Sequence, residues 1–153
     1  MTGYELGADG EDGDELNELR HLINRMLIEH LKSEETGAIE AAKTDPLLAG
    51  LPERFAAQSA HRQSVRRLPE GAVLLAGNRF EPHHAYRIGE RAWGVQFHPE
   101  FSADAMRCYI DTLAPSLSDA GRDVQALRTG VRDTPDAAAL LGRFARLCSA
   151  PAG

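Results

Sequence analysis

The segment that decides the fold is AWGVQFHPEF, residues 92–101, in which a β-prone run ends at a histidine. Val95 and Phe97 alternate with Gly94 and Gln96, a pattern typical of a strand with one buried face. Pro99 fixes φ at about −65° and has no backbone N–H, so the chain turns away at that point. The sequence therefore places His98 at the rigid end of a strand, where its imidazole can be aimed into a crevice.

Glu100 follows His98 by two residues, so its carboxylate can reach one of the two ring nitrogens. A carboxylate in that position fixes the tautomer of the imidazole and stabilises the imidazolium, as in a catalytic triad. Such a pair does chemistry only when a nucleophile lies within about 3 Å of the ring. The same residues also fit an ordinary strand terminus followed by a polar turn, so the motif by itself leaves both interpretations open.

The composition, 42% hydrophobic and 26% charged residues in a chain of 153, is typical of one globular domain. The net charge of −6 is concentrated in residues 1–20, and the rest of the chain is neutral. This argues against nucleic acid as a partner, because no basic face is available for phosphates.

No apolar run approaches the roughly 20 residues of a membrane span. With an acidic start and no apolar signal segment, we expect a cytoplasmic protein that does not engage a membrane.

Periodicity divides the chain into an N-terminal helix, a β-rich centre and C-terminal helices. Apolar residues at three- and four-residue steps from Leu16 to Leu31 predict an amphipathic helix over residues 15–35, with a packing face. Three short runs, at 72–76, 84–88 and 92–97, predict strands with antiparallel neighbours. Further helices are expected over 102–114 with Ser102 as N-cap, over 119–129, and over 134–148 with Thr134 as N-cap.

The GVQFHPEF segment closely resembles the His-x-Glu segment of class I glutamine amidotransferases. The segments DPLLAGLP, AHRQSV, LPEGAVLLA and PHHAYRIG precede it in the same order as in stand-alone members similar to the glutaminase domain of GMP synthase. The resemblance covers residues 36–148 and is strongest over 45–110. Residues 1–35 show no resemblance to the family, and residues 149–153 form a tail.

The resemblance implies an α/β fold, here a partial flavodoxin-like amidotransferase sheet with a short antiparallel β meander and C-terminal helices. It also implies L-glutamine as substrate, with a cysteine that attacks the side-chain amide and with a histidine and a glutamate that complete the triad. His98 matches the catalytic histidine and Glu100 its carboxylate partner. Ser59, Ala60 and His61 match a loop that lines the glutamine pocket. No cofactor is implied.

The family's nucleophile elbow, Gly-x-Cys-x-Gly, does not occur in this sequence, and neither does Gly-x-Ser-x-Gly. Cys108 lies inside a predicted helix and Cys148 at the end of another, so neither is expected to have the geometry of an elbow. The sequence thus predicts the His-Glu half of a triad in a chain that is truncated relative to the family. We expect it to be inactive alone and to hydrolyse glutamine only when a second polypeptide supplies the cysteine.

The alternative is a non-catalytic remnant that acts as an oligomerising or partner-binding module through an exposed strand edge and an apolar face. The remaining conspicuous side chains point to no further chemistry. His83 and His84 lack a third ligand at suitable spacing, so no metal site is predicted. Trp93 is expected to pack on the core or to support His98.

Overall fold

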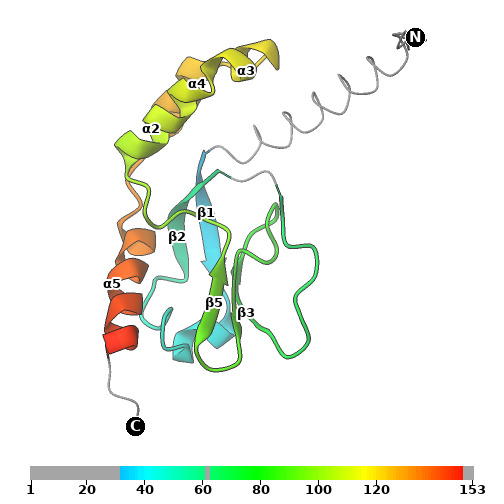
Figure 1. Ribbon diagram of the computed structural model, residues 1–153, viewed down its shortest axis with the longest axis vertical. Coiled ribbons are helices and arrows are strands. Elements are labelled where there is room, and N and C mark those ends of the chain that lie inside the picture. The colour runs from blue at the N-terminus through cyan, green and yellow to red at the C-terminus, as the bar shows by residue number, and fades with distance from the viewer. Residues whose placement is uncertain (1–31, 61–62, 150–153) are drawn as a thin grey trace, which may run out of the picture.

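The computed structural model describes residues 32–60 and 63–149, which form a five-stranded sheet followed by helices (Figure 1). The predicted helix over residues 15–31 lies outside the described residues. The strands are β1 Lys32–Ala38, β2 Arg54–Ser59, β3 Val73–Gly77, β4 Ala85–Ile88 and β5 Ala92–Val95. The helices are the 3-10 helix η1 Glu40–Thr44 and the α-helices α2 Ala103–Thr112, α3 Ala114–Asp119, α4 Val124–Gly130 and α5 Pro135–Ser149. None of the described helices is long and apolar enough to cross a membrane.

The sheet has the order β2-β1-β3-β4-β5, and each of its four strand pairs is antiparallel. The meander predicted from residues 72–97 is confirmed as β3, β4 and β5. The helix predicted through residue 35 is wrong at its end, because residues 32–35 belong to β1. Strand β1 is polar. Its buried Glu34 forms an ion pair with Lys32 at 3.1 Å and accepts a hydrogen bond from Asn78 Nδ2 at 3.2 Å. These polar partners allow a charged residue to occupy a buried strand position.

The main core lies between the sheet and helix α5, which runs alongside β2 in Figure 1. Phe55 of β2 and Phe97, just after β5, meet edge to face with ring centroids 5.9 Å apart. This is one of the geometries that aromatic pairs prefer. Leu48, Leu75 and Leu140 complete the buried centre.

The turn after η1 is organised by the buried carboxylate of Asp45, which is 2% exposed. Its Oδ1 accepts the backbone N–H groups of Leu47 and Leu48 at 2.9 and 3.1 Å and the indole N–H of Trp93 at 3.1 Å. Its Oδ2 accepts Arg87 Nε at 2.9 Å. Asp45 therefore ties the 45–53 turn to strands β4 and β5. Trp93, which also contacts Phe144 edge to face, takes part in this packing.

Helices α2, α3 and α4 pack together beyond one end of the sheet around a second apolar cluster that includes Met106, Ile110 and Leu117. Helix α2 begins as predicted, with Ser102 Oγ accepting the N–H of Ala105 at 3.1 Å. Helix α5 begins at Pro135, directly after Thr134, close to the predicted bounds. The single helix expected over 119–129 is instead the end of α3 and the separate helix α4, because Gly121 adopts a positive φ of 72° between them.

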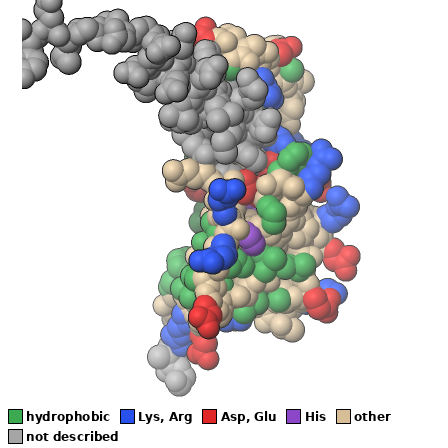
Figure 2. Space-filling model, turned by 90° about the vertical axis from the view of Figure 1, so that its right-hand side faces the viewer, with side chains coloured by type: hydrophobic (Ala, Val, Ile, Leu, Met, Phe, Trp, Pro, Cys, Tyr) green, Lys and Arg blue, Asp and Glu red, His purple; other side chains and the backbone are tan. Residues whose placement is uncertain are grey.

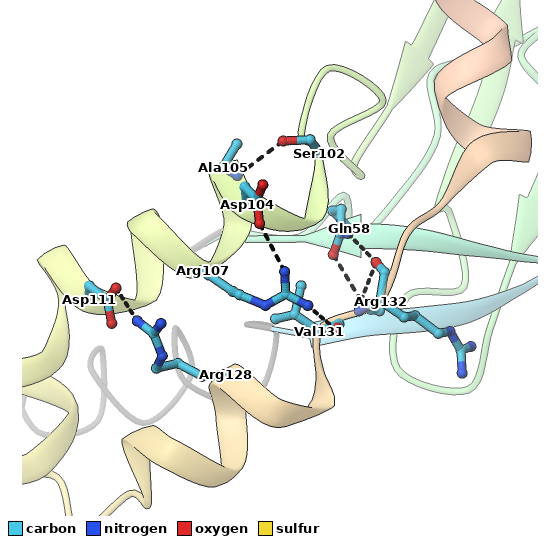
Figure 3. A network of polar contacts seen from close by, with 10 residues as sticks. Gln58, Ser102, Asp104, Ala105, Arg107, Asp111, Arg128, Val131 and Arg132 are labelled. Atoms are coloured by element: carbon cyan, nitrogen blue, oxygen red, sulfur yellow. Dashed lines mark hydrogen bonds and ion pairs between the residues drawn. The ribbon is translucent and has the colours of Figure 1, made fainter.

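A chain of polar contacts joins this helical group to the sheet (Figure 3). Arg107 of α2 pairs with Asp104 at 3.0 Å and donates to the carbonyl of Val131 at 3.0 Å. Gln58 of β2 donates to the carbonyl of Arg132 at 2.8 Å. Within the helical group Arg128 pairs with Asp111, and this hydrogen bond, with the charge of Asp111, raises the pKa of the Arg128 guanidinium. The position of α2 relative to β2 is therefore fixed by several hydrogen bonds.

The surface seen from the side of β3 carries Lys, Arg, Asp and Glu side chains around a hydrophobic area (Figure 2). The charges of the two signs are interspersed among the described residues of this face. Among the described residues visible on this face, the basic side chains do not form one continuous patch.

Candidate active site

His98 lies where the two edges of the sheet approach each other. The strands β2 and β5 are at opposite ends of the strand order, yet the backbone N–H of His98 donates to the carbonyl of Gln58 at 2.8 Å. Just before it, the N–H of Gln96 donates to the carbonyl of His84 at 2.9 Å. The sheet is therefore curled, and the extension of β5 crosses from β4 to the end of β2. This crossing holds the chain at two neighbouring points, Gln96 against β4 and His98 against β2.

The imidazole of His98 contacts an acceptor at each ring nitrogen. Nδ1 lies 2.7 Å from Glu100 Oε1, and Nε2 lies 3.3 Å from the carbonyl oxygen of Ala60. A carboxylate and a carbonyl both accept, so both contacts are hydrogen bonds only when both ring nitrogens carry protons. A ring that carries both protons, the form that a catalytic histidine takes after it accepts a proton, would have an acceptor for each N–H.

Phe101 supports the ring from one face. Its ring stacks on that of His98 with centroids 4.4 Å apart and an angle of 19° between the planes. The N–H of Phe101 donates to the carbonyl of His98 at 3.2 Å, which closes the turn around Pro99. Phe101 in turn contacts Tyr109 of α2 at 5.9 Å between centroids. Phe101 is not among the residues predicted from the sequence, although an aromatic residue three positions after a strand-end histidine was a usable signal.

The His98–Glu100 pair is accessible from solvent. The side chain of His98 is 32% exposed and that of Glu100 is 53% exposed. A contact as exposed as this one contributes little to stability even when both partners are charged, because water screens it. The contact between His98 and Glu100 is therefore not expected to contribute much to the stability of the fold.

The predicted pocket residues are partly brought together with His98. Ala60 contacts the ring through its carbonyl oxygen. The side chain of Ser59 is buried, and its hydroxyl has no hydrogen-bond partner among the described residues. His61 lies outside the described residues. Gln58, which was not predicted from the sequence, fixes the backbone of His98 and has two side-chain hydrogen bonds of its own.

Both cysteines are exposed on helices, Cys108 on α2 and Cys148 near the end of α5. Neither lies on a sharp strand-to-helix turn, the position that an elbow nucleophile requires. His83 and His84 are adjacent in sequence but serve different contacts. His83 Nδ1 donates to the carbonyl of Val65 at 2.6 Å, and His84 Nδ1 lies 3.0 Å from the hydroxyl of Thr36 in the core. Within the described ranges, no group of three or more His, Cys, Asp or Glu residues is placed to hold a metal ion.

Comparison with known proteins relates the chain as a whole to one family of enzymes. The family model "Glutamine amidotransferase class-I" matches residues 10–110. GMP synthase (glutamine-hydrolyzing) of Porphyromonas gingivalis is 46% identical over 57 residues, which are 37% of this chain and 11% of that protein. The enzyme of the same name from Thermosipho africanus is 35% identical over 86 residues, 56% of this chain and 17% of that protein. A protein of Methanoculleus marisnigri, named as one subunit of a GMP synthase (glutamine-hydrolyzing), is 37% identical over 65 residues, 42% of this chain and 35% of that protein.

The chain thus spans a small part of the length of these relatives. In fold, it is similar to the crystal structure of a glutamine amidotransferase from Thermotoga maritima, with a TM-score of 0.62 and 18% identity. That similarity covers 95% of this chain and 74% of the other. The mixed α/β fold expected from the resemblance is confirmed, and its described sheet is antiparallel and curled. Since the family model covers well over half of the sequence, the chain belongs to the class I glutamine amidotransferase family.

Proposed function

We propose that His98 and Glu100 are the acid–base half of a glutamine-hydrolysing site whose cysteine is supplied by another polypeptide. The observation that carries the proposal is the 2.7 Å contact between Nδ1 and Glu100, with Nε2 directed at the Ala60 carbonyl on the opposite side of the ring. The absence of Gly-x-Cys-x-Gly from the sequence supports the second part. The Methanoculleus relative, named as a subunit, supports the idea of a partner chain.

The chemistry assigns each residue a role. His98 accepts the thiol proton, and the thiolate attacks the side-chain amide carbon of glutamine. The tetrahedral intermediate then collapses, the C–N bond breaks, and His98 returns the proton to the departing ammonia. In the second half, His98 accepts a proton from the water that attacks the thioester carbon, the C–S bond breaks to release glutamate, and His98 returns the proton to the sulfur. Glu100 holds the ring in position and stabilises the imidazolium, and the family resemblance assigns Ser59, Ala60 and His61 to the glutamine pocket.

The chain alone is expected to release no ammonia from L-glutamine above the uncatalysed background, because neither of its two cysteines lies on an elbow that could present a thiol to His98. The measurement is a coupled ammonia assay on the purified chain, with the Cys108→Ala variant as the matched control. Robust ammonia release that disappears in Cys108→Ala would show that the nucleophile lies within this chain, and this part of the proposal would be wrong.

The second polypeptide can be supplied deliberately. We define the complemented assembly as the full chain co-expressed and co-purified with the cysteine-bearing half of the Porphyromonas gingivalis GMP synthase, the relative that is 46% identical over the matched segment. The control assembly carries an alanine in place of the cysteine of that half. Glutaminase activity in the first assembly and its loss in the control are the expected results.

A second candidate function, an oligomerising or partner-binding module, rests on an apolar groove between β5 and α5. Its lining residues are all apolar: Leu47, Trp93, Val95, Pro99, Leu140, Leu141 and Phe144. Leu141 and Phe144 are each 47% exposed, and Val95 lies on the edge strand. Exposed apolar side chains gathered beside a strand edge are typical of an association surface. Pro99 places the groove next to the candidate active site.

If this groove mediates self-association, Phe144→Glu is expected to shift the chain from a dimer to a monomer, because it places a charge in an apolar contact. Sedimentation velocity over a range of concentrations measures the change. Phe80→Glu is the matched control, since Phe80 is 45% exposed but does not line the groove. A wild-type chain that stays monomeric at high concentration contradicts this candidate function.

A further inference from the structure

The side chain of Gln96 has all three of its hydrogen-bonding groups occupied. Its carbonyl oxygen Oε1 accepts the backbone N–H of Val65 at 2.8 Å. Its Nε2 donates to Glu81 Oε2 at 3.0 Å and to the carbonyl of His83 at 3.0 Å. These partners fix the orientation of the amide, because exchanging its oxygen and nitrogen would place acceptors against acceptors and donors against donors.

Glu81 holds the same loop from a second direction. The residue is fully buried, and its Oε1 accepts the hydroxyl proton of Ser64 at 2.6 Å. His83 adds a third contact through its bond to the carbonyl of Val65 at 2.6 Å. Ser64 and Val65 lie in an irregular segment, so these side chains supply hydrogen bonds that a helix or strand would otherwise provide.

Gln96 and His98 lie two residues apart just after β5, where residues 96 and 97 form a bend. His98 contacts the carbonyl of Ala60, and Gln96 contacts the N–H of Val65. The chain between these two contact points is short, since only four residues separate Ala60 from Val65. The same short segment, residues 96–98, therefore contacts both Ala60 and Val65.

We infer that Gln96 and Glu81 are positioning residues for the glutamine site: they join the Ser64–Val65 loop to the segment that carries His98, and so fix the ring of His98 where it contacts the Ala60 carbonyl. The inference rests on the proposed function, in which the segment around Ala60 lines the pocket of the substrate. A carboxylate buried beside an amide is suited to this role, because the charge strengthens its hydrogen bonds and makes the loss of either partner costly.

The test is Gln96→Glu, which keeps the shape of the side chain and replaces its donor. The new carboxylate oxygen faces Glu81 Oε2 and the carbonyl of His83, so repulsion is expected to release the loop. Amide hydrogen exchange measured by NMR on the full chain is expected to show at least tenfold faster exchange at Val65. The ring resonances of His98 are expected to shift, although the substitution does not touch that ring. The amide of Leu75 in the core reports whether the rest of the fold is intact.

Two matched variants complete the design. Gln63→Glu adds the same charge at an exposed position of the same loop, and wild-type values are expected at Val65 and His98. The double variant Glu81→Gln with Gln96→Glu exchanges the amide and the carboxylate. It is expected to recover most of the protection at Val65, because a donor again faces an acceptor.

If Gln96→Glu does not fold, Ser64→Ala is the variant to measure. It removes one hydrogen bond from the loop without burying a charge, and at least threefold faster exchange of the Val65 amide is then expected.

The inference is overturned if a folded Gln96→Glu variant exchanges the Val65 amide at the wild-type rate. Where Ser64→Ala replaces that variant, a wild-type rate in Ser64→Ala overturns it in the same way. So does faster exchange at Val65 with unchanged His98 resonances, because the network would then hold the loop without affecting the site. A double variant no better protected than the single one also contradicts the inference. None of these readouts depends on glutaminase activity, so a failure of the proposed function would be seen separately, in the ammonia assay.

Discussion

His98→Asn is expected to lower the glutaminase activity of the complemented assembly by at least about 10³-fold, which corresponds to about 4 kcal/mol of transition-state stabilisation. Asparagine can still donate and accept hydrogen bonds, but it cannot accept the proton of a thiol. The effect is expected in kcat, because the ring moves a proton in the reaction and contributes little to binding of the amide. Steady-state ammonia release by the variant and wild-type assemblies measures it.

Glu100→Gln is expected to have a smaller effect, about tenfold or more, since it removes the charge that stabilises the imidazolium but preserves the shape of the side chain. The exposure of Glu100 reduces the electrostatic loss, because water partly replaces the carboxylate. Glu90→Gln, at an exposed turn position, is the matched control and should leave activity unchanged. Equal activity of His98→Asn and wild-type assemblies would contradict the role given to His98.

Asp45→Ala is expected to lower the free energy of unfolding by about 3 kcal/mol or more, the range seen when one partner of a buried charged pair is removed. The substitution leaves the N–H groups of Leu47 and Leu48 without their side-chain acceptor and separates Arg87 and Trp93 from the turn. Urea denaturation followed by circular dichroism measures the loss, and a fall in Tm of about 10 °C is the thermal counterpart.

Asp119→Ala provides the control for Asp45, because Asp119 is exposed at the end of α3. A change within about 0.5 kcal/mol is expected there. Asp45→Asn is expected to fall between the two, since the amide keeps one acceptor for the backbone but presents a donor to Arg87. If Asp45→Ala were as stable as the wild type, the turn would not depend on this carboxylate.

The sequence predicted those helices and strands whose own residues show a clear periodicity, turn or cap. Strands β3, β4 and β5 follow β-prone runs separated by turn residues, and helix α2 follows its N-cap Ser102. Strand β1 carries no such signal, because Glu34 and Thr36 occupy its buried positions and their partners come from elsewhere in the chain. Strand β2 combines Ala56 and Ala57 with polar residues, and alanine has low β propensity.

The contact between His98 and Glu100 followed from their spacing of two residues. The curl of the sheet did not, since it depends on a backbone hydrogen bond between Gln58 and His98, 40 positions apart in the sequence. The role of Gln96 was equally hidden, because a glutamine on the polar face of a strand is ordinarily a surface residue. Only the tertiary structure brings Val65, Glu81 and His83 around its amide.

The central claim is that this chain contributes the acid–base pair to a thiol from another polypeptide. Its most direct test is to titrate the chain into the cysteine-bearing half of the relative and to measure ammonia release from L-glutamine. Each polypeptide alone should be inactive, and activity should rise with added chain until the two are equimolar. Activity that is already complete in the chain alone, or a complex of the two that never releases ammonia, would contradict the account.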